Sequence, residues 1–210
     1  MRKLPVYLLL DTSGSMYGEP LDAVKNGLES LAQTLRQDPY ALETAHLSVI
    51  TFATDAVQAV PLTEITDFQI PALEARGQTS MGRALELLAE RVDEEVSKTT
   101  PEKKGDWKPL VFLMSDGAPT DRLDKGIEAL KKRDFGMIVA CAAGSNAHTD
   151  VLKLITDDVV RLDSLDSDSI KAFFKWVSAS VSAGSARVES GAGISALDEL
   201  PPPPEEITIV

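Results

Sequence analysis

The sequence predicts an α/β protein with a Rossmann-like, doubly wound central sheet that is mostly parallel and has helices on both faces. Short, continuous apolar runs alternate along the chain with helical patterns, which is typical of a parallel sheet whose strands are buried on both faces. Two of these runs lead into an aspartate, Asp11 and Asp116, at the strand ends where such sheets place their ligand sites. One run is followed across Thr54-Asp55 by a second extended run, which predicts one antiparallel edge strand.

Apolar runs bounded by polar turn residues mark the predicted strands. The first, residues 6–10, reads Val-Tyr-Leu-Leu-Leu without interruption and stops at Asp11. Most later runs have the same character, and the run after Asp55 is the predicted edge strand. In chain order the predicted strands are residues 6–10, 47–52, 57–62, 110–114, 137–142 and 159–162.

Apolar residues at steps of three and four indicate the helices between these strands. The first pattern begins near Pro20, which suits a first helical turn, and ends at Asp38-Pro39. The second follows a polar loop, residues 76–82, and has its apolar face between Ala84 and Val96. The remaining predicted helices cover about residues 123–132, 151–155 and 167–182.

The composition changes near the end of the chain, which predicts two parts. Residues 1–182 are predicted to form one folded domain, and residues 183–210 a flexible linker with an acidic, proline-containing tail. Residues 183–196 are rich in Gly, Ser and Ala, as linkers are, and the four prolines at 201–204 favour an extended polyproline II segment. The tail has two open interpretations: a disordered end, or a docking peptide whose residues 207–210 add as a strand to a partner's sheet.

The charge balance limits the partners that we expect. The chain has 33 acidic and 21 basic residues, a formal net charge of −12, which argues against nucleic acid or an anionic membrane surface as a partner. No stretch approaches the roughly 20 apolar residues that span a bilayer, and the apolar run after Met1 is too short for a signal peptide. Because Cys141 is the only cysteine, no internal disulfide can form. We therefore expect a cytoplasmic protein.

Five oxygen-bearing side chains are predicted to converge at the carboxyl edge of the sheet: Asp11, Ser13, Ser15, Thr79 and Asp116. All are hard ligands of the kind that Mg²⁺ prefers, with Mn²⁺ or Ca²⁺ as alternatives. No sulfur or imidazole is offered. Two carboxylates and three neutral hydroxyls leave a divalent ion incompletely satisfied, so an acidic group from a partner can complete its shell.

The flanks of these residues resemble the metal-ion-dependent adhesion site, or MIDAS, of von Willebrand factor type A (VWA) domains. The matching motifs are Asp11-x-Ser13-x-Ser15, Gly77 to Leu85 around Thr79, and Leu113 to Asp121 around Asp116. The resemblance covers roughly residues 4–182 and includes all five site positions. It implies the VWA fold and a non-enzymatic module that binds an acidic side chain of a partner protein through a divalent cation.

The resemblance also implies a role for each residue. Ser13 and Ser15 would ligate the metal directly through Oγ, and Thr79 would do so when a partner carboxylate is bound. Asp11 and Asp116 would act mainly through water or as charge balance, with Asp116 able to approach the ion when no partner is bound.

More narrowly, residues 4–20 and 35–40 are similar to bacterial TerY-type proteins of tellurium-resistance gene clusters. In such systems the domain is associated with a protein kinase and a PP2C-like phosphatase. The similarity implies a stress-response or tellurite-resistance context with phosphorylation signalling, and a Ser/Thr kinase and a PP2C-like phosphatase as partners.

Two alternatives remain at the level of the sequence. Asp11, Ser13 and Ser15 are also residue types that cap turns and helices. A metal-dependent phosphatase or hydrolase could use the strand-end aspartates Asp11 and Asp116, but phosphatases of the haloacid dehalogenase type need a second carboxylate where this chain has Ser13. The chain also lacks a P-loop and a Gly-x-Ser-x-Gly motif. We therefore expect no enzymatic activity.

Overall fold

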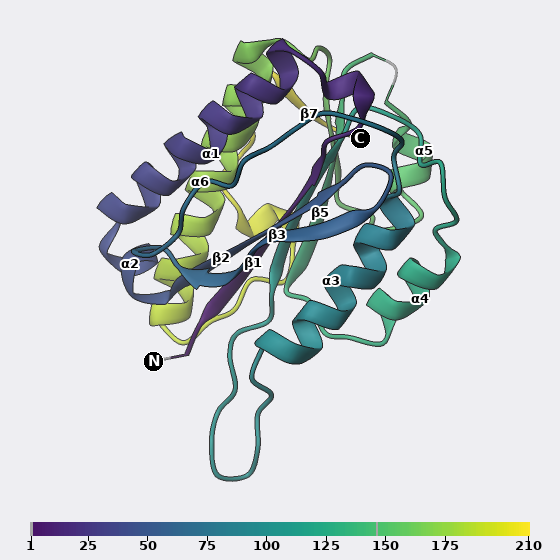
Figure 1. Ribbon diagram of the computed structural model, residues 1–210. Coiled ribbons are helices and arrows are strands. Elements are labelled where there is room, and N and C mark those ends of the chain that lie inside the picture. Colours follow the sequence, from purple (N-terminus) through teal and green to yellow (C-terminus); the bar gives the residue numbers. More distant parts are fainter. Residues whose placement is uncertain (1, 146) are drawn as a thin grey trace.

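A single sheet forms the centre of the computed structural model, which describes residues 2–145 and 147–210 (Figure 1). In these residues it has seven strands in the order β3-β2-β1-β4-β5-β6-β7. The strands are β1 (Leu4–Asp11), β2 (Ala45–Phe52), β3 (Ala56–Glu64), β4 (Leu110–Ser115), β5 (Met137–Ala143), β6 (Val159–Leu162) and β7 (Ile207–Ile209). The helical elements are η1 (Gly14–Met16), α1 (Glu19–Gln37), α2 (Pro39–Thr44), α3 (Met81–Glu95), α4 (Asp124–Lys131), α5 (Thr149–Leu152), α6 (Ser167–Glu189) and η2 (Leu197–Glu199).

The predicted fold class is confirmed. Five neighbouring strands, β2, β1, β4, β5 and β6, pair in parallel, and β3 is the predicted antiparallel edge strand. The strand order reverses between β1 and β4, which is the place where an open α/β sheet binds ligands. A second antiparallel edge strand, β7, was not predicted, and it pairs with β6.

Strand β1 explains why an unbroken apolar run was needed. Its side chains alternate between the two faces of the sheet, and both faces are covered. Leu8 and Leu10 pack under α1 and α6, whereas Tyr7 and Leu9 pack under α3 on the opposite face. All eight residues of β1 are buried.

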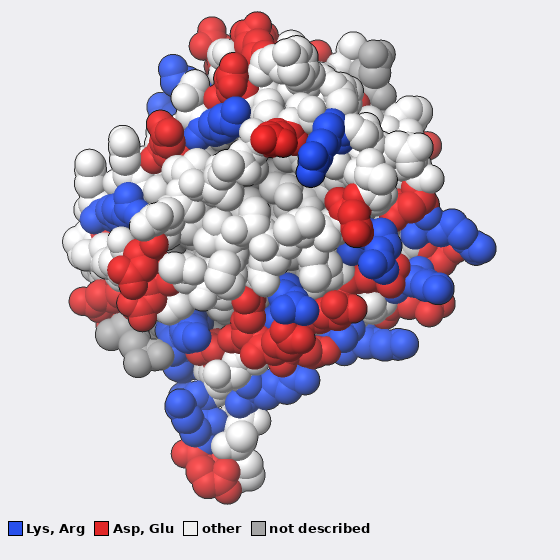
Figure 2. All heavy atoms as spheres, in the orientation of Figure 1, with Lys and Arg blue, Asp and Glu red and all other residues white. Residues whose placement is uncertain are grey.

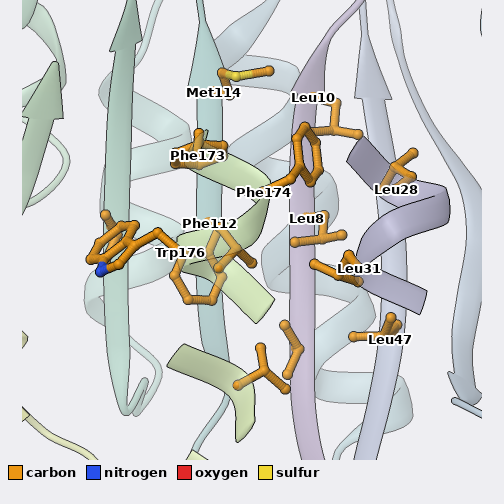
Figure 3. Packing of buried hydrophobic residues seen from close by; sticks show 14 of the residues in the cluster. Leu8, Leu10, Leu28, Leu31, Leu47, Phe112, Met114, Phe173, Phe174 and Trp176 are labelled. Atoms are coloured by element: carbon orange, nitrogen blue, oxygen red, sulfur yellow. The ribbon is translucent and has the colours of Figure 1, made fainter. Parts of the chain in front are cut away.

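The larger core cluster lies between the sheet and the helix pair α1 and α6 (Figure 3). Leu28 and Leu31 of α1 face β1, while Phe173 and Trp176 of α6 lie against β4. The Phe112 and Trp176 rings meet edge to face with centroids 6.3 Å apart, a favourable aromatic arrangement. Trp176 is 3% exposed and is therefore a core residue.

The structure ends the last helix later than the sequence predicts. The prediction placed the end near Ser182 with a flexible linker from Ala183, but α6 continues to Glu189. The reason is packing: a Cβ on Gly184 would lie 2.8 Å from Ile194 Cδ1, so the small residues here form a close contact surface instead of a linker. Composition alone does not distinguish the two cases.

The tail beyond α6 packs back onto the domain. The indole Nε1 of Trp176 donates to the carbonyl of Pro201 at 2.8 Å, and Arg187 contacts Glu199 at 2.6 Å. Leu200 and Ile207 are buried. The segment predicted as a linker and tail thus contributes β7 to this chain's own sheet. In the described residues no helix is both long and apolar enough to cross a membrane.

Gly27 sets how closely α1 and α6 approach, and replacing it tests this contact. A Cβ at position 27 would lie 2.2 Å from Cδ2 of Phe174. We expect Gly27→Ala to lower the free energy of unfolding by about 1–3 kcal/mol, because overpacking outweighs the gain in helix propensity. Chemical denaturation measures the change. The neighbouring Asn26→Ala, at an exposed position, is the control, and equal stability of the two variants would contradict the close contact.

Strand β7 allows a matched comparison of two isoleucines. Ile207 is 4% exposed and Ile209 is 55% exposed. We expect Ile207→Ala to destabilise the protein by about 2–4 kcal/mol, because a buried side chain is lost, and Ile209→Ala by less than about 1 kcal/mol. Thermal and denaturant unfolding give both values. Equal effects would mean that the tail does not pack as described.

Candidate metal centre

Two neighbouring strands bring the candidate carboxylates together. Leu10 of β1 is in register with Met114 of β4, so Asp11, the last residue of β1, lies beside the end of β4. Ser115 ends β4 and Asp116 follows it. The site is therefore at the point where the strand order reverses.

Asp11 is buried and uses both carboxylate oxygens to orient the site. Oδ1 accepts the backbone N–H of Ser13 at 2.8 Å, and Oδ2 accepts the hydroxyl of Ser115 at 2.5 Å. Its side chain is inaccessible to solvent, at 0% exposure. Burial raises the pKa of Asp11, while the hydrogen bonds from Ser115 and Ser13 oppose that rise. The carboxylate thus holds the loop after β1 against the end of β4.

The two serines form a chain of oxygens that ends on the second carboxylate. Ser13 Oγ and Ser15 Oγ are 3.0 Å apart, and Ser15 Oγ donates to Asp116 Oδ1 at 2.8 Å. The short helix η1 places the two hydroxyls on one side of the turn, with Ser13 buried and Ser15 exposed. Burial raises the pKa of Asp116, and the hydrogen bond from Ser15 opposes that rise.

Thr79 arrives from the loop before α3 and is held by its backbone. Its N–H donates to Thr120 Oγ1 at 3.1 Å, and its carbonyl accepts the N–H of Thr120 at 2.9 Å. Thr79 Oγ1 lies 3.8 Å from the point that a Cβ on Gly117 would occupy, so the hydroxyl faces the end of β4. Within the described residues this hydroxyl makes no hydrogen bond of its own.

The loop after β1 and the loop before α3 are also joined directly by backbone hydrogen bonds. The N–H of Gly14 donates to the carbonyl of Gly77 at 3.1 Å, and the N–H of Arg76 donates to the carbonyl of Thr12 at 2.9 Å. All five predicted site residues are thus brought to one edge of the sheet. Four are linked by hydrogen bonds within the cluster, and Thr79 is placed beside them by its loop.

The donor set fits a hard divalent cation. The cluster offers hydroxyl and carboxylate oxygens, and the hydrogen bond from Ser15 Oγ to Asp116 Oδ1 already brings two of them together. Among the described residues no group of three or more His, Cys, Asp or Glu side chains is placed to hold a metal ion. A metal site at this cluster would therefore need its serine and threonine hydroxyls as ligands.

Three supporting residues were not recognised from the sequence as part of the site. Ser115 orients Asp11, and Thr120 holds Thr79. Asp121 lies just before α4, but its oxygens accept the backbone N–H groups of Gly82 and Arg83 and so cap α3. The one available signal was Ser115, a polar residue at the end of an otherwise apolar run.

A pocket of about 460 Å³ adjoins the cluster on the side of β5 and β6. Ser15 and Asp116 line it together with Gly144 and Leu165. A ligand atom in this pocket can reach Ser15, the exposed hydroxyl of the chain of oxygens.

The family model for the von Willebrand factor type A domain matches residues 6–175. The chain belongs to this family. No curated protein sequence matches it. Solved structures share the VWA fold, at identities too low to show more than the fold.

Three similar structures illustrate the range of proteins that contain this fold. A VWA protein from Catenulispora acidiphila has 20% identity and a TM-score of 0.67, covering 87% of this chain and 43% of that one. The pilus adhesin SpaC from Lactobacillus rhamnosus GG has 13% identity and a TM-score of 0.67, covering 87% and 31%. Proximal thread matrix protein 1 from the mussel byssus, with a zinc-occupied MIDAS motif, has 20% identity and a TM-score of 0.57, covering 84% and 46%. The VWA chain described here therefore spans less than half the length of these three proteins.

The raised pKa of Asp11 predicts a pH-dependent stability. In metal-free protein the folded state favours the neutral carboxyl, so stability from this group is present below its ordinary pKa of 3.8 and is lost as pH rises through the raised pKa. We expect Asp11→Asn, which stays neutral, to be more stable than the wild type in EDTA at neutral pH, with the difference shrinking toward pH 3.8. Denaturant unfolding across this range measures it. An Asp11→Asn protein less stable than the wild type in EDTA at neutral pH would contradict the prediction.

Proposed function

We propose that this VWA domain is a non-enzymatic binding module that holds a divalent cation and, through it, an acidic side chain of a partner protein. The observation that carries the proposal is the chain of oxygens from Ser13 through Ser15 to Asp116, beside Thr79. This set of oxygens carries few negative charges, and its end at Ser15 is open to solvent. A partner carboxylate can therefore reach the ion and supply the missing negative charge.

The proposed residue roles follow from burial. Ser13, Ser15 and Thr79 would hold the cation through their hydroxyls, and Asp116 would balance its charge. Asp11 would orient the loop, because both its oxygens already accept hydrogen bonds from the protein. The bound cation would supply a positive charge that attracts the partner's carboxylate. We propose Mg²⁺, with Mn²⁺ or Ca²⁺ as alternatives, and the zinc-occupied site of the mussel protein supports a divalent ion in general.

The biological setting is also a proposal. The similarity of residues 4–20 and 35–40 to TerY-type proteins supports a bacterial stress or tellurite-resistance system in the cytoplasm. A Ser/Thr kinase and a PP2C-like phosphatase of the same system are the proposed partners. Cys141, buried in the core and alone, is compatible with a reducing compartment.

The alternative, a metal-dependent phosphatase or hydrolase, has weaker support. A nucleophilic Asp11 would need an exposed oxygen, but both of its oxygens accept hydrogen bonds and the side chain is inaccessible to solvent. Ser13 occupies the position where such enzymes carry a second carboxylate. A phosphatase assay with Mg²⁺ and an aryl phosphate distinguishes the two functions.

Metal titration tests the site itself. We expect isothermal titration calorimetry to show one Mg²⁺ per chain, and Ser13→Ala and Thr79→Ala to weaken binding by at least about tenfold. Asp134→Ala is the control, because this exposed aspartate precedes β5 at the opposite edge of the sheet and should leave the affinity unchanged. Equal affinity of all four proteins would contradict the proposed site.

Partner capture tests the function. Immobilised chain incubated with native extract should retain protein in Mg²⁺ and release it in EDTA, because the partner's acidic side chain is held through the ion. A Ser15→Ala chain should retain less, while the Asp134→Ala chain should match the wild type. Retention that is the same in EDTA and in Mg²⁺ would contradict a metal-dependent interaction, and mass spectrometry would identify what is retained.

A further inference from the structure

A groove of about 510 Å³ lies between the β2–β3 hairpin and the segment of residues 71–76, and we call it the hairpin groove. Thr51, Val57 and Ala59 line it from the hairpin, and Ala72 and Leu73 line it from the segment. Among the residues that line the groove, only Asp55, Glu74 and Arg76 are charged. The hairpin groove is therefore largely uncharged, on a protein of net charge −12.

The surface around the groove has the same character. Val57 is 58% exposed, although it is an apolar, β-branched residue. Figure 2, in the orientation of Figure 1, shows a broad area without Lys, Arg, Asp or Glu over β3 and the neighbouring loop, bordered by charged groups. An uncharged surface of this kind indicates a contact site for another polypeptide.

The segment beside the groove has an open backbone. Residues 69–75 belong to no helix or strand, and in the described part of the chain their C=O groups, and their N–H groups except at Pro71, which has none, make no hydrogen bonds to protein. The next residue, Arg76, is bonded to Thr12. Residues 72–74 of this segment line the hairpin groove, so an extended guest chain there can pair with their backbone groups, as in strand addition.

The hairpin groove adjoins the loop after β1, which carries part of the candidate metal centre, although none of the five site residues lines the groove. Thr12 lines the groove and lies between Asp11 and Ser13 in sequence. Its carbonyl accepts the N–H of Arg76, which also lines the groove. A ligand that fills the groove therefore ends beside the loop that carries the site's first aspartate and serines.

We propose that the hairpin groove binds an extended segment of the same partner whose acidic side chain reaches the metal. This inference rests on the proposed function and adds the partner's conformation and composition. The segment has small or β-branched uncharged residues on one side of the acidic residue, because the groove is lined mainly by small and apolar uncharged side chains. It pairs its backbone with residues 72–74, the part of the open segment that lines the groove.

Selection of short random peptides with one fixed aspartate, displayed on phage and captured by the full chain in Mg²⁺, tests the proposal. Enriched peptides should carry Val, Ile, Thr or Ala on one side of the aspartate. Ala72→Arg and Val57→Arg, both at exposed positions, should weaken binding of the enriched peptide by at least about tenfold. Leu154→Arg, a matched change at an exposed apolar residue that does not line the groove, should have no effect.

The outcomes separate this inference from the proposed function. Peptide affinity unchanged by both groove variants overturns the hairpin groove, and so does a selection that enriches no peptide. Calorimetry of the Ala72→Arg chain should give unchanged Mg²⁺ affinity, which shows that the metal centre is intact. Peptide binding that Ala72→Arg abolishes but EDTA leaves unchanged supports the groove and overturns the metal-dependent function.

Discussion

The buried carboxylate of Asp11 is the constraint on which the site depends. It joins the loop after β1 to the end of β4 through Ser13 and Ser115, and so fixes the distance between the parts that carry the serines and Asp116. Burying a charged carboxylate costs free energy, and the hydrogen bonds to its two oxygens offset part of that cost. The hydroxyl chain is positioned before any ligand arrives, which lowers the entropy that binding must offset.

The fold was predictable where local pattern and tertiary position agree. The run Val6 to Leu10 is apolar at every position because its strand is covered on both faces, and a strand with one face in water would alternate with polar residues. The end of α6 and the pairing of β7 with this chain's own β6 were not predictable, because Gly184 and its neighbours look like a linker unless Ile194 is known to pack on them. Gly184 and Ile194 are ten positions apart on different segments, and no local sequence pattern indicates that they touch.

The same distinction applies to the site. The types and order of Asp11, Ser13 and Asp116 were readable, since each follows a recognisable strand or loop. The residues that hold them were not, because Ser115 and Asp121 act through bonds to distant segments: Ser115 on Asp11, and Asp121 on the start of α3. Sequence motifs name the groups that face a ligand more readily than the groups that support them.

Strand β7 has a consequence for the behaviour of the molecule in concentrated solution. Without it, β6 would expose a row of unpaired backbone groups, which is a template for edge-to-edge aggregation. The strand that replaces it as the edge is only three residues long and follows the four prolines at 201–204, so it offers little to a second molecule. At the opposite side, β3 contains Pro61 and an irregular register with β2. Both margins of the sheet are therefore poorly suited to self-association, which favours colloidal stability of the folded protein.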